Sequence, residues 1–235
     1  MKFTLAWLKE HLGNKASLHP SPIEGSASQT IYFVTDVEAD GPEPARNSML
    51  SFGTVACSIE RGIIDQFYAM LKPRNDRISH PEVMTWWKTQ PKAYAEATRE
   101  PRDAEEVTHE FAAWIESFDG NRVFAAAPLS FDGAWIDEYF RTYLSTRLAV
   151  GPLSQRRIFS GYGLDLPSYM SGLFGWNPAT ASQNLDQAPA WMRGNVVHSH
   201  KAIDDALGYA HILLNAIQIS GKREALPQDY MRSSK

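Results

Sequence analysis

Three acidic residues at alternate positions follow an apolar run near the start of the chain. In the stretch IYFVTDVEADGP, residues 31–42, the apolar letters predict a buried strand, and Asp36, Glu38 and Asp40 come at its end. Alternate side chains of an extended chain point to the same side, so these carboxylates should lie together. Like charges crowded on one face of a core strand are unfavourable unless positive charge lies among them. The stretch therefore predicts a site that holds a cation.

Two later stretches add residues of the same chemical kind. Asp132 lies in PLSFDGAW, just after a predicted strand, and HKAIDDA places His200 five residues before Asp205, in the approach to a predicted helix. Each is weak evidence alone, because Asp132 could equally be a helix cap. Together they offer carboxylates, which bind Mg²⁺ and Mn²⁺, and an imidazole that titrates near neutral pH.

The elements that must position these residues alternate along the chain. Apolar and β-branched runs predict five strands, over 30–37, 48–60, 62–73, 121–128 and 156–161. Helical spacing predicts helices over 103–118, with Asp103 and Glu106 as a capping box, and over 131–144, 164–175, with Asp165 as cap, and 201–219. Residues 175–199 are predicted to form a loop. A three-strand meander followed by alternating helix and strand indicates an α/β fold, a mixed five-stranded sheet flanked by helices.

Composition limits the class of protein. The 235 residues, 43% of them hydrophobic, suit one domain over 29–220, preceded by an extension and linker over 1–28 and followed by a polar tail over 221–235. A net charge of -4 argues against a generally basic protein that coats duplex nucleic acid, but not against one that uses metal ions and a local patch. With Cys57 alone and no long apolar run, we expect a cytoplasmic protein without membrane association.

In their order and placement the acidic stretches resemble the motifs of the DEDDh branch of the 3′–5′ exonucleases, over roughly residues 30 to 218. The Asp-x-Glu motif is matched by Asp36 and Glu38, the Phe-Asp motif by Phe131 and Asp132, and the His-x-x-x-x-Asp motif by His200 and Asp205. DVEADG, SMLSFG and HPEVMTWWKTQ look most similar to bacterial exoribonucleases and phage DexA-like members. One departure is Pro128, which stands where many relatives have Asn.

The resemblance implies a ribonuclease H-like fold and two divalent cations, Mg²⁺ or Mn²⁺. Asp36 would bridge both cations, Glu38 and Asp205 would bind the one beside the nucleophilic water, and Asp132 would act mostly through water. His200 would be the general base. Two cations about 4 Å apart can stabilise both the attacking and the leaving oxygen of a phosphodiester.

The implied activity is release of nucleoside 5′-monophosphates from the 3′ end of single-stranded or 3′-tailed nucleic acid. RNA is favoured over DNA as the substrate, and a homodimer is plausible by likeness alone. An exodeoxyribonuclease is the alternative within the class. A catalytically inactive nucleic-acid-binding module is the alternative outside it.

Several residues keep two interpretations. His198 would replace His200 in a shifted register, but Ile203 stands where that register needs an acid. Trp86 and Trp87, on a predicted helix, either pack in the core or stack on an unpaired base. Arg156 and Arg157 lie in a segment without acids, which either follows the substrate backbone or is a plain basic surface.

Overall fold

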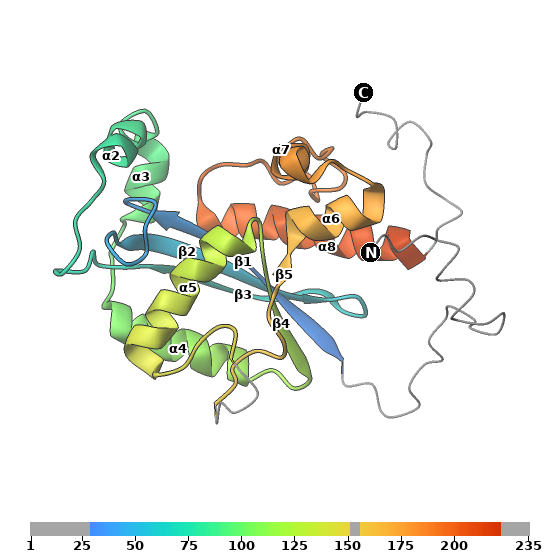
Figure 1. Cartoon of the computed structure of the whole chain (residues 1–235), viewed down its shortest axis with the longest axis horizontal. Helices are drawn as coiled ribbons and strands as arrows, with labels where there is room; N and C mark the ends of the chain where they lie inside the picture. The colour runs from blue at the N-terminus through green and yellow to red at the C-terminus, as the bar shows by residue number, and fades with distance from the viewer. Residues whose placement is uncertain (1–28, 151–155, 222–235) are drawn as a thin grey trace, which may run out of the picture.

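A computed structural model describes residues 29–150 and 156–221 (Figure 1). The predicted N-terminal extension, and all but the first residue of the predicted C-terminal tail, lie outside these residues. Among the helices in the described ranges, none is long and apolar enough to cross a membrane.

The sheet is mixed and five-stranded, as predicted, with the order β3-β2-β1-β4-β5. Its strands are β1 (Thr30–Ala39), β2 (Met49–Ser58), β3 (Gly62–Met70), β4 (Asn121–Ala126) and β5 (Leu164–Asp165). The first three strands form an antiparallel meander, and β4 and β5 join parallel to β1. Because β1 and β4 are parallel neighbours, the chain leaves both strands at the same edge of the sheet.

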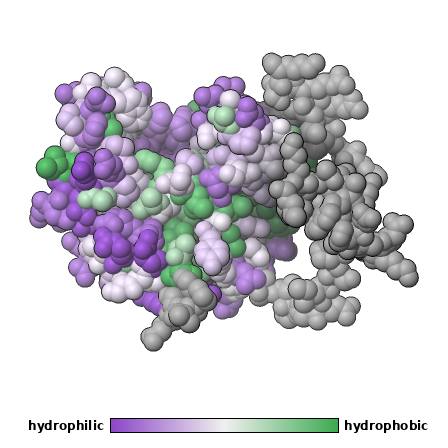
Figure 2. Space-filling model, in the orientation of Figure 1, coloured by the Kyte–Doolittle hydropathy of each residue, from purple (hydrophilic) through white to green (hydrophobic). Residues whose placement is uncertain are grey.

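The position of the fifth strand differs from the prediction over 156–161. These residues form no strand, and β5 begins at Leu164. Ile158 and Phe159 are buried in the core, so their apolar character reflects packing and not strand pairing. Figure 2, in the orientation of Figure 1, shows apolar residues at the surface around the short strand β5, with more hydrophilic residues on either side.

Helices cover both faces of the sheet (Figure 1). They are α2 (Pro81–Trp87), α3 (Pro91–Ala97), α4 (Ala104–Glu116), η1 (Leu129–Gly133), α5 (Ala134–Tyr139), η2 (Phe140–Leu144), α6 (Leu166–Phe174), η3 (Pro178–Thr180), α7 (Ala181–Asp186) and α8 (Ala202–Gly221). Both predicted cap residues act as caps, since the carboxylate of Asp103 accepts from the backbone N–H of Glu105 and Glu106, and that of Asp165 from Ser168. The carboxylate of Glu106, predicted as the second half of a capping box, pairs with Arg102.

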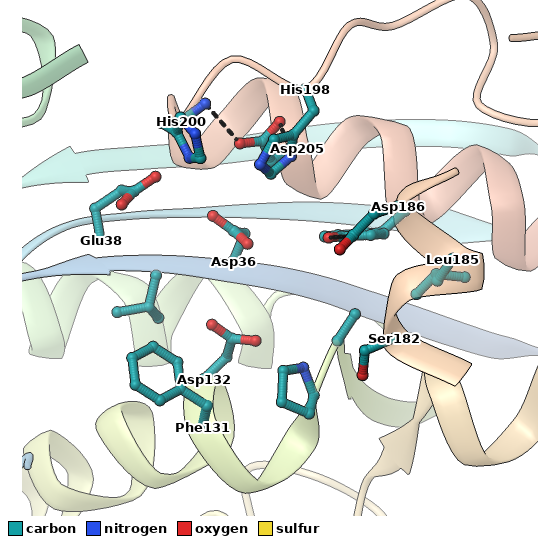
Figure 3. Close-up of a pocket in the computed structure, with 14 residues that line it drawn as sticks. Asp36, Glu38, Phe131, Asp132, Ser182, Leu185, Asp186, His198, His200 and Asp205 are labelled. Carbon is teal, nitrogen blue, oxygen red and sulfur yellow. Dashed lines mark hydrogen bonds and ion pairs between the residues drawn. The ribbon is translucent and has the colours of Figure 1, made fainter. Parts of the chain in front are cut away.

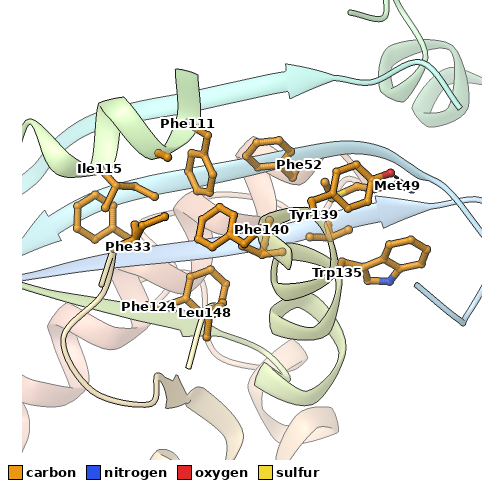
Figure 4. Close-up of a cluster of buried hydrophobic side chains, with 14 of the residues drawn as sticks. Phe33, Met49, Phe52, Phe111, Ile115, Phe124, Trp135, Tyr139, Phe140 and Leu148 are labelled. Atoms are coloured by element: carbon orange, nitrogen blue, oxygen red, sulfur yellow. Dashed lines mark hydrogen bonds between the residues drawn. The ribbon is translucent and has the colours of Figure 1, made fainter. Parts of the chain in front are cut away.

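Two hydrophobic cores lie on opposite faces of the sheet, and alternation along β1 assigns its side chains between them. Phe33 and Val37 belong to the core shared with α4 and α5 (Figure 4), whereas Val34 belongs to the core shared with α6 and α8. Asp36 and Glu38 continue the alternation of Val34, so they face the α8 side. The strand pattern alone therefore directs both acids toward the helix that carries the third motif.

The predicted loop over 175–199 is partly helical, so that prediction is wrong for its first half. The side chain of Asn177 accepts from the N–H of Ala179 and caps the turn η3, from which α7 continues. Ala181 and Leu185 of α7 are buried. Asn and Pro indicated a loop here, but they cap and start these short helices, which core packing then stabilises.

Candidate active site

A cleft of about 270 Å³ opens at the edge of the sheet where β1 and β4 end (Figure 3). Residues from β1, η1, α7, α8 and the loop before α8 line it. The lining residues are Asp36, Val37, Glu38, Ala127, Pro128, Phe131, Asp132, Ser182, Leu185, Asp186, His198, His200, Asp205 and Tyr209. The structure therefore brings all five motif residues, which span about 170 positions of the sequence, into one cleft.

Local backbone structure places the second and third acids. The carbonyl of Pro128, directly after β4, accepts from the N–H of Phe131 and of Asp132, and this turn points Asp132 back over the end of β1 (Figure 3). The carboxylate of Asp205, in the first turn of α8, accepts from the backbone N–H of Ser199 at 3.0 Å and of His200 at 2.9 Å. His200 has a φ of 55°, a left-handed conformation that non-glycine residues rarely adopt.

The acids lie close enough together to share a cation. One ligand oxygen from each of Asp36, Glu38 and Asp205 lies within 4.8 Å of the others. Glu38, Asp132 and Asp205 are buried, and Asp36 is partly exposed to the cleft. Within the described ranges, five carboxylates line this cleft and no Lys or Arg does.

This crowding shifts the pKa values of the carboxyl groups upward. Burial, followed by the charges of Asp132 and Glu38, raises the pKa of Asp36 well above its usual range. Burial and the charge of Asp205 raise the pKa of Glu38 to about 9. Burial also raises the pKa of Asp132 to about 8, although hydrogen bonds to backbone groups such as that of Val37 oppose the shift. The charged form of the cluster is thus unfavourable without a cation.

This donor set fits hard divalent cations. All four motif acids offer oxygen, and Mg²⁺ and Mn²⁺ prefer oxygen ligands. The raised pKa values of Asp36, Glu38 and Asp132 are those expected of crowded, buried carboxylates without a cation. Asp36, Glu38 and Asp205 form one set of neighbouring ligand oxygens, and Asp132 faces Asp36 from η1 (Figure 3).

Both histidines of the loop before α8 line the cleft. The Nδ1 of His198 donates to Oδ1 of Asp205 at 3.0 Å, and this hydrogen bond raises the pKa of His198. Burial, and then the neighbouring His198, lower the pKa of His200, which favours the neutral form that a general base requires. Spacing argues against His198, because Ile203 stands five residues after it, yet the ring centre of His198 lies 4.6 Å from that of His200.

Asp186 is a further acid of the cleft that sequence analysis missed. It accepts a hydrogen bond from the hydroxyl of Tyr209 at 3.0 Å. Asp186 lies in the segment predicted as a loop, and Tyr209 lies in the helix predicted over 201–219 without any role assigned to it. An i, i+4 pair of polar residues, Ser182 and Asp186, is the signal in the sequence that α7 presents a polar face.

The two tryptophans of α2 have different environments. Trp86 is 39% exposed, and its ring packs edge to face on that of His200, with centres 5.1 Å apart. Trp87 is only 2% exposed, and its indole N–H donates to the carbonyl of Ala39 at 2.9 Å. Trp87 therefore anchors α2 to β1 from the core. Of the two tryptophans, only Trp86 is exposed beside the cleft.

Arg156 and Arg157 do not line the cleft. Arg156 pairs with Glu116 at 3.0 Å, and Ser160, a little further along, donates its N–H to Arg122 at the start of β4. Arg122 of β4 pairs with Ile31 of β1. Ile31 precedes Asp36 by five residues, which is roughly 16 Å along the strand at 3.3 Å per residue. This basic segment lies near the opposite end of the sheet from the acids.

Solved structures similar to this fold are nucleases. The nuclease domain of 3′hExo, described as a DEDDh family member and bound to rAMP, superposes with a TM-score of 0.55 at 11% identity, covering 82% of this chain and 93% of that one. Exonuclease I of E. coli in complex with single-stranded DNA gives a TM-score of 0.57 at 18% identity, covering 86% of this chain but only 42% of that one. At these identities the likeness shows the fold, which is the ribonuclease H-like exonuclease fold.

Comparison with curated proteins finds no significant match. The sequence model of the 3′-5′ exoribonuclease Rv2179c-like domain, in contrast, matches residues 32–217, which include all five motif residues. The match covers most of the chain, and the chain belongs to the family of the 3′-5′ exoribonuclease Rv2179c-like domain.

Proposed function

We propose that the protein is a metal-dependent 3′–5′ exoribonuclease that removes nucleoside 5′-monophosphates one at a time from the 3′ end of single-stranded or 3′-tailed RNA. The observation that carries the proposal is the cluster of four buried or partly buried carboxylates in a cleft that no Lys or Arg of the described chain lines. Burial raises the pKa of three of them, Asp36, Glu38 and Asp132. Such a cluster repels an anionic substrate unless cations bind between the acids and the substrate.

The four acids would divide the binding of two Mg²⁺ or Mn²⁺ ions. Asp36 stands between the other three and would contact both ions, Glu38 and Asp205 would hold one, and Asp132 would act on the other side of Asp36. When bound, the ions would offset the charge of the phosphodiester and make water more acidic. The chain positions these carboxylates rigidly, on β1, on η1 and in the first turn of α8.

His200 would accept the proton of the attacking water. Its lowered pKa keeps the imidazole neutral near pH 7, and its backbone N–H is held by Asp205. The edge-to-face contact with Trp86 limits the orientations of the ring. Asp205 thus holds the backbone of His200, and Trp86 contacts its ring.

Trp86 and Phe131 would pack on the bases of the substrate. Both are large aromatic residues that remain more than one-third exposed beside the acids, Trp86 next to His200 and Phe131 next to Asp132. Stacking of a base on an aromatic ring is worth roughly 1–3 kcal/mol and tolerates any base. This arrangement suits an enzyme that shortens strands without regard to sequence.

RNA is the proposed substrate because the matched family is described as exoribonucleases. Similar structures are bound to rAMP in one case and to single-stranded DNA in another, so DNA is the second candidate. Carboxylates and cations contact the phosphate, which both polymers share, and only contacts to the 2′-hydroxyl can separate them.

The test is digestion of matched single-stranded RNA and DNA oligonucleotides, labelled at the 5′ end, with Mg²⁺ or Mn²⁺. We expect a ladder that shortens from the 3′ end, nucleoside 5′-monophosphates by mass spectrometry, and faster cleavage of RNA. Replacing Asp36 with Ala should lower the rate by at least about 10³-fold, because removal of a bridging ligand disrupts both cation sites.

The control is Asp119→Ala, which removes an exposed acid outside the cleft and should leave the rate unchanged. A wild-type protein that binds the oligonucleotide but shortens neither polymer would identify an inactive binding module. Equal rates for Asp36→Ala and wild type would show that the metal site is assigned incorrectly.

A further inference from the structure

Helix α7 forms one wall of the cleft, and none of the four motif acids lies on it. Ser182, Leu185 and Asp186 are spaced i, i+3 and i+4, so they share one face of α7, and all three line the cleft. Figure 3 shows Asp186 on the opposite side of Asp36 from Glu38. A hydroxyl, an aliphatic group and a carboxylate together can contact the sugar and base of a nucleotide.

The orientation of Asp186 is fixed from behind. The hydroxyl of Tyr209 on α8 donates to its Oδ1 at 3.0 Å. Tyr209 is itself buried, and the guanidinium of Arg193, which is 4% exposed, lies 5.4 Å from the centre of its ring. A phenol held in this way keeps the carboxylate directed into the cleft.

Asp186 is exposed at the cleft, and its second oxygen has no partner among the described residues, since Tyr209 supplies its one hydrogen bond and no cationic side chain pairs with it. An ionised carboxylate can only accept hydrogen bonds. Beside an anionic substrate it is repulsive unless the substrate offers a donor. A ribose offers its 2′-hydroxyl at a place where deoxyribose has only hydrogen.

We propose that Asp186, supported by Tyr209, accepts a hydrogen bond from a ribose 2′-hydroxyl in the cleft and so makes the enzyme prefer RNA. This inference rests on the proposed exonuclease function and names the residue that sets its sugar preference. When a bound nucleotide covers this oxygen and displaces its water, a sugar that lacks the hydroxyl leaves the acceptor unpaired, and the site discriminates against that sugar.

The test compares RNA and DNA oligonucleotides of one sequence, at saturating Mg²⁺, for wild type and variants of the full chain. Asp186→Ala should lower kcat/KM on RNA about tenfold, the loss expected for a hydrogen bond to a charged group, and should leave DNA cleavage unchanged or faster. Tyr209→Phe should shift the RNA-to-DNA ratio in the same direction by about threefold. Asp186→Asn keeps an acceptor oxygen and should retain more of the preference.

Asp204→Ala is the matched control, since Asp204 is a partly exposed acid of α8 that pairs with Lys201 and does not line the cleft. An unchanged ratio in Asp186→Ala, an equal loss on both polymers, or a higher Mg²⁺ requirement without a change in ratio would each overturn the inference. A wild-type protein inactive on both polymers would instead reject the proposed exonuclease function.

Discussion

His198 and His200 differ in environment although they are two residues apart. His198 donates its side-chain Nδ1–H to Asp205, whereas His200 donates its backbone N–H and leaves its ring toward Trp86 and the cleft. The hydrogen bond to Asp205 raises the pKa of His198 and so favours its protonated form beside the acids. A histidine in its protonated form cannot accept a proton from water.

The two histidines should therefore respond differently to substitution. His200→Ala should lower kcat by roughly 10²- to 10⁴-fold, the usual contribution of a general base, and remove the acidic limb of the pH–rate profile. His198→Ala should lower kcat about tenfold at most and keep that limb. Steady-state rates between pH 5 and 9 measure both effects, and the reverse pattern would assign the base to His198.

At the scale of elements, the site depends on how closely α8 approaches the sheet. Gly53 on β2 pairs with Asp36 on β1, and a Cβ at Gly53 would lie 2.4 Å from the backbone of Ile203 in the first turn of α8. No side chain fits at this position. Because Gly53 has none, the start of α8 can lie close enough to the sheet to place Asp205 beside the acids of β1.

Gly53→Ala should push the first turn of α8 away from β1. We expect a loss of about 1–3 kcal/mol in the free energy of unfolding, and a fall in kcat of about 10²-fold because Asp205 and His200 move. Urea unfolding and steady-state rates measure the two effects.

Gly172→Ala is the control for this substitution. Gly172 lies in α6 with nothing within 4 Å of an added Cβ, so the variant should be as stable as wild type or slightly more stable. Full activity in Gly53→Ala would show that the approach of α8 does not set the geometry of the site.

At the scale of the whole molecule, the acid cluster makes stability depend on pH and on metal. The folded-state pKa values of Glu38, about 9, and Asp132, about 8, lie above the values near 4 of an unfolded chain. The protonated groups therefore favour the folded state fully below about pH 4, and this contribution is lost as the pH rises toward 9.

The Tm of the protein in EDTA should accordingly fall as the pH rises from 6 to 9. Added Mg²⁺ should raise the Tm by several degrees, and by more at pH 9 than at pH 6, because cations bind the charged form. Asp132→Asn should flatten the pH dependence in EDTA. Thermal unfolding followed by circular dichroism measures each curve, and a Tm that Mg²⁺ leaves unchanged throughout this range would contradict a cation site in the cleft.

The alternation of residues along β1 is enough to predict that Asp36 and Glu38 lie on one face of the strand. Strand periodicity has a strict period of two, so Val34 in the α8-side core directs Asp36 and Glu38 to the same side. The cap at Asp165 and the entry of Asp205 into the first turn of a helix also followed from local rules, since capping involves only neighbouring backbone groups.

Which of two neighbouring residues is buried and which lies at the cleft depends on tertiary packing. Trp86 and Trp87 are the same residue type about 100° apart on one short helix, and only the position of α2 against Ala39 buries one and exposes the other. Asp186 joins the cleft because Tyr209, 23 residues later, reaches it from α8. Contacts between segments distant in sequence leave no local pattern, because they depend on how whole elements pack.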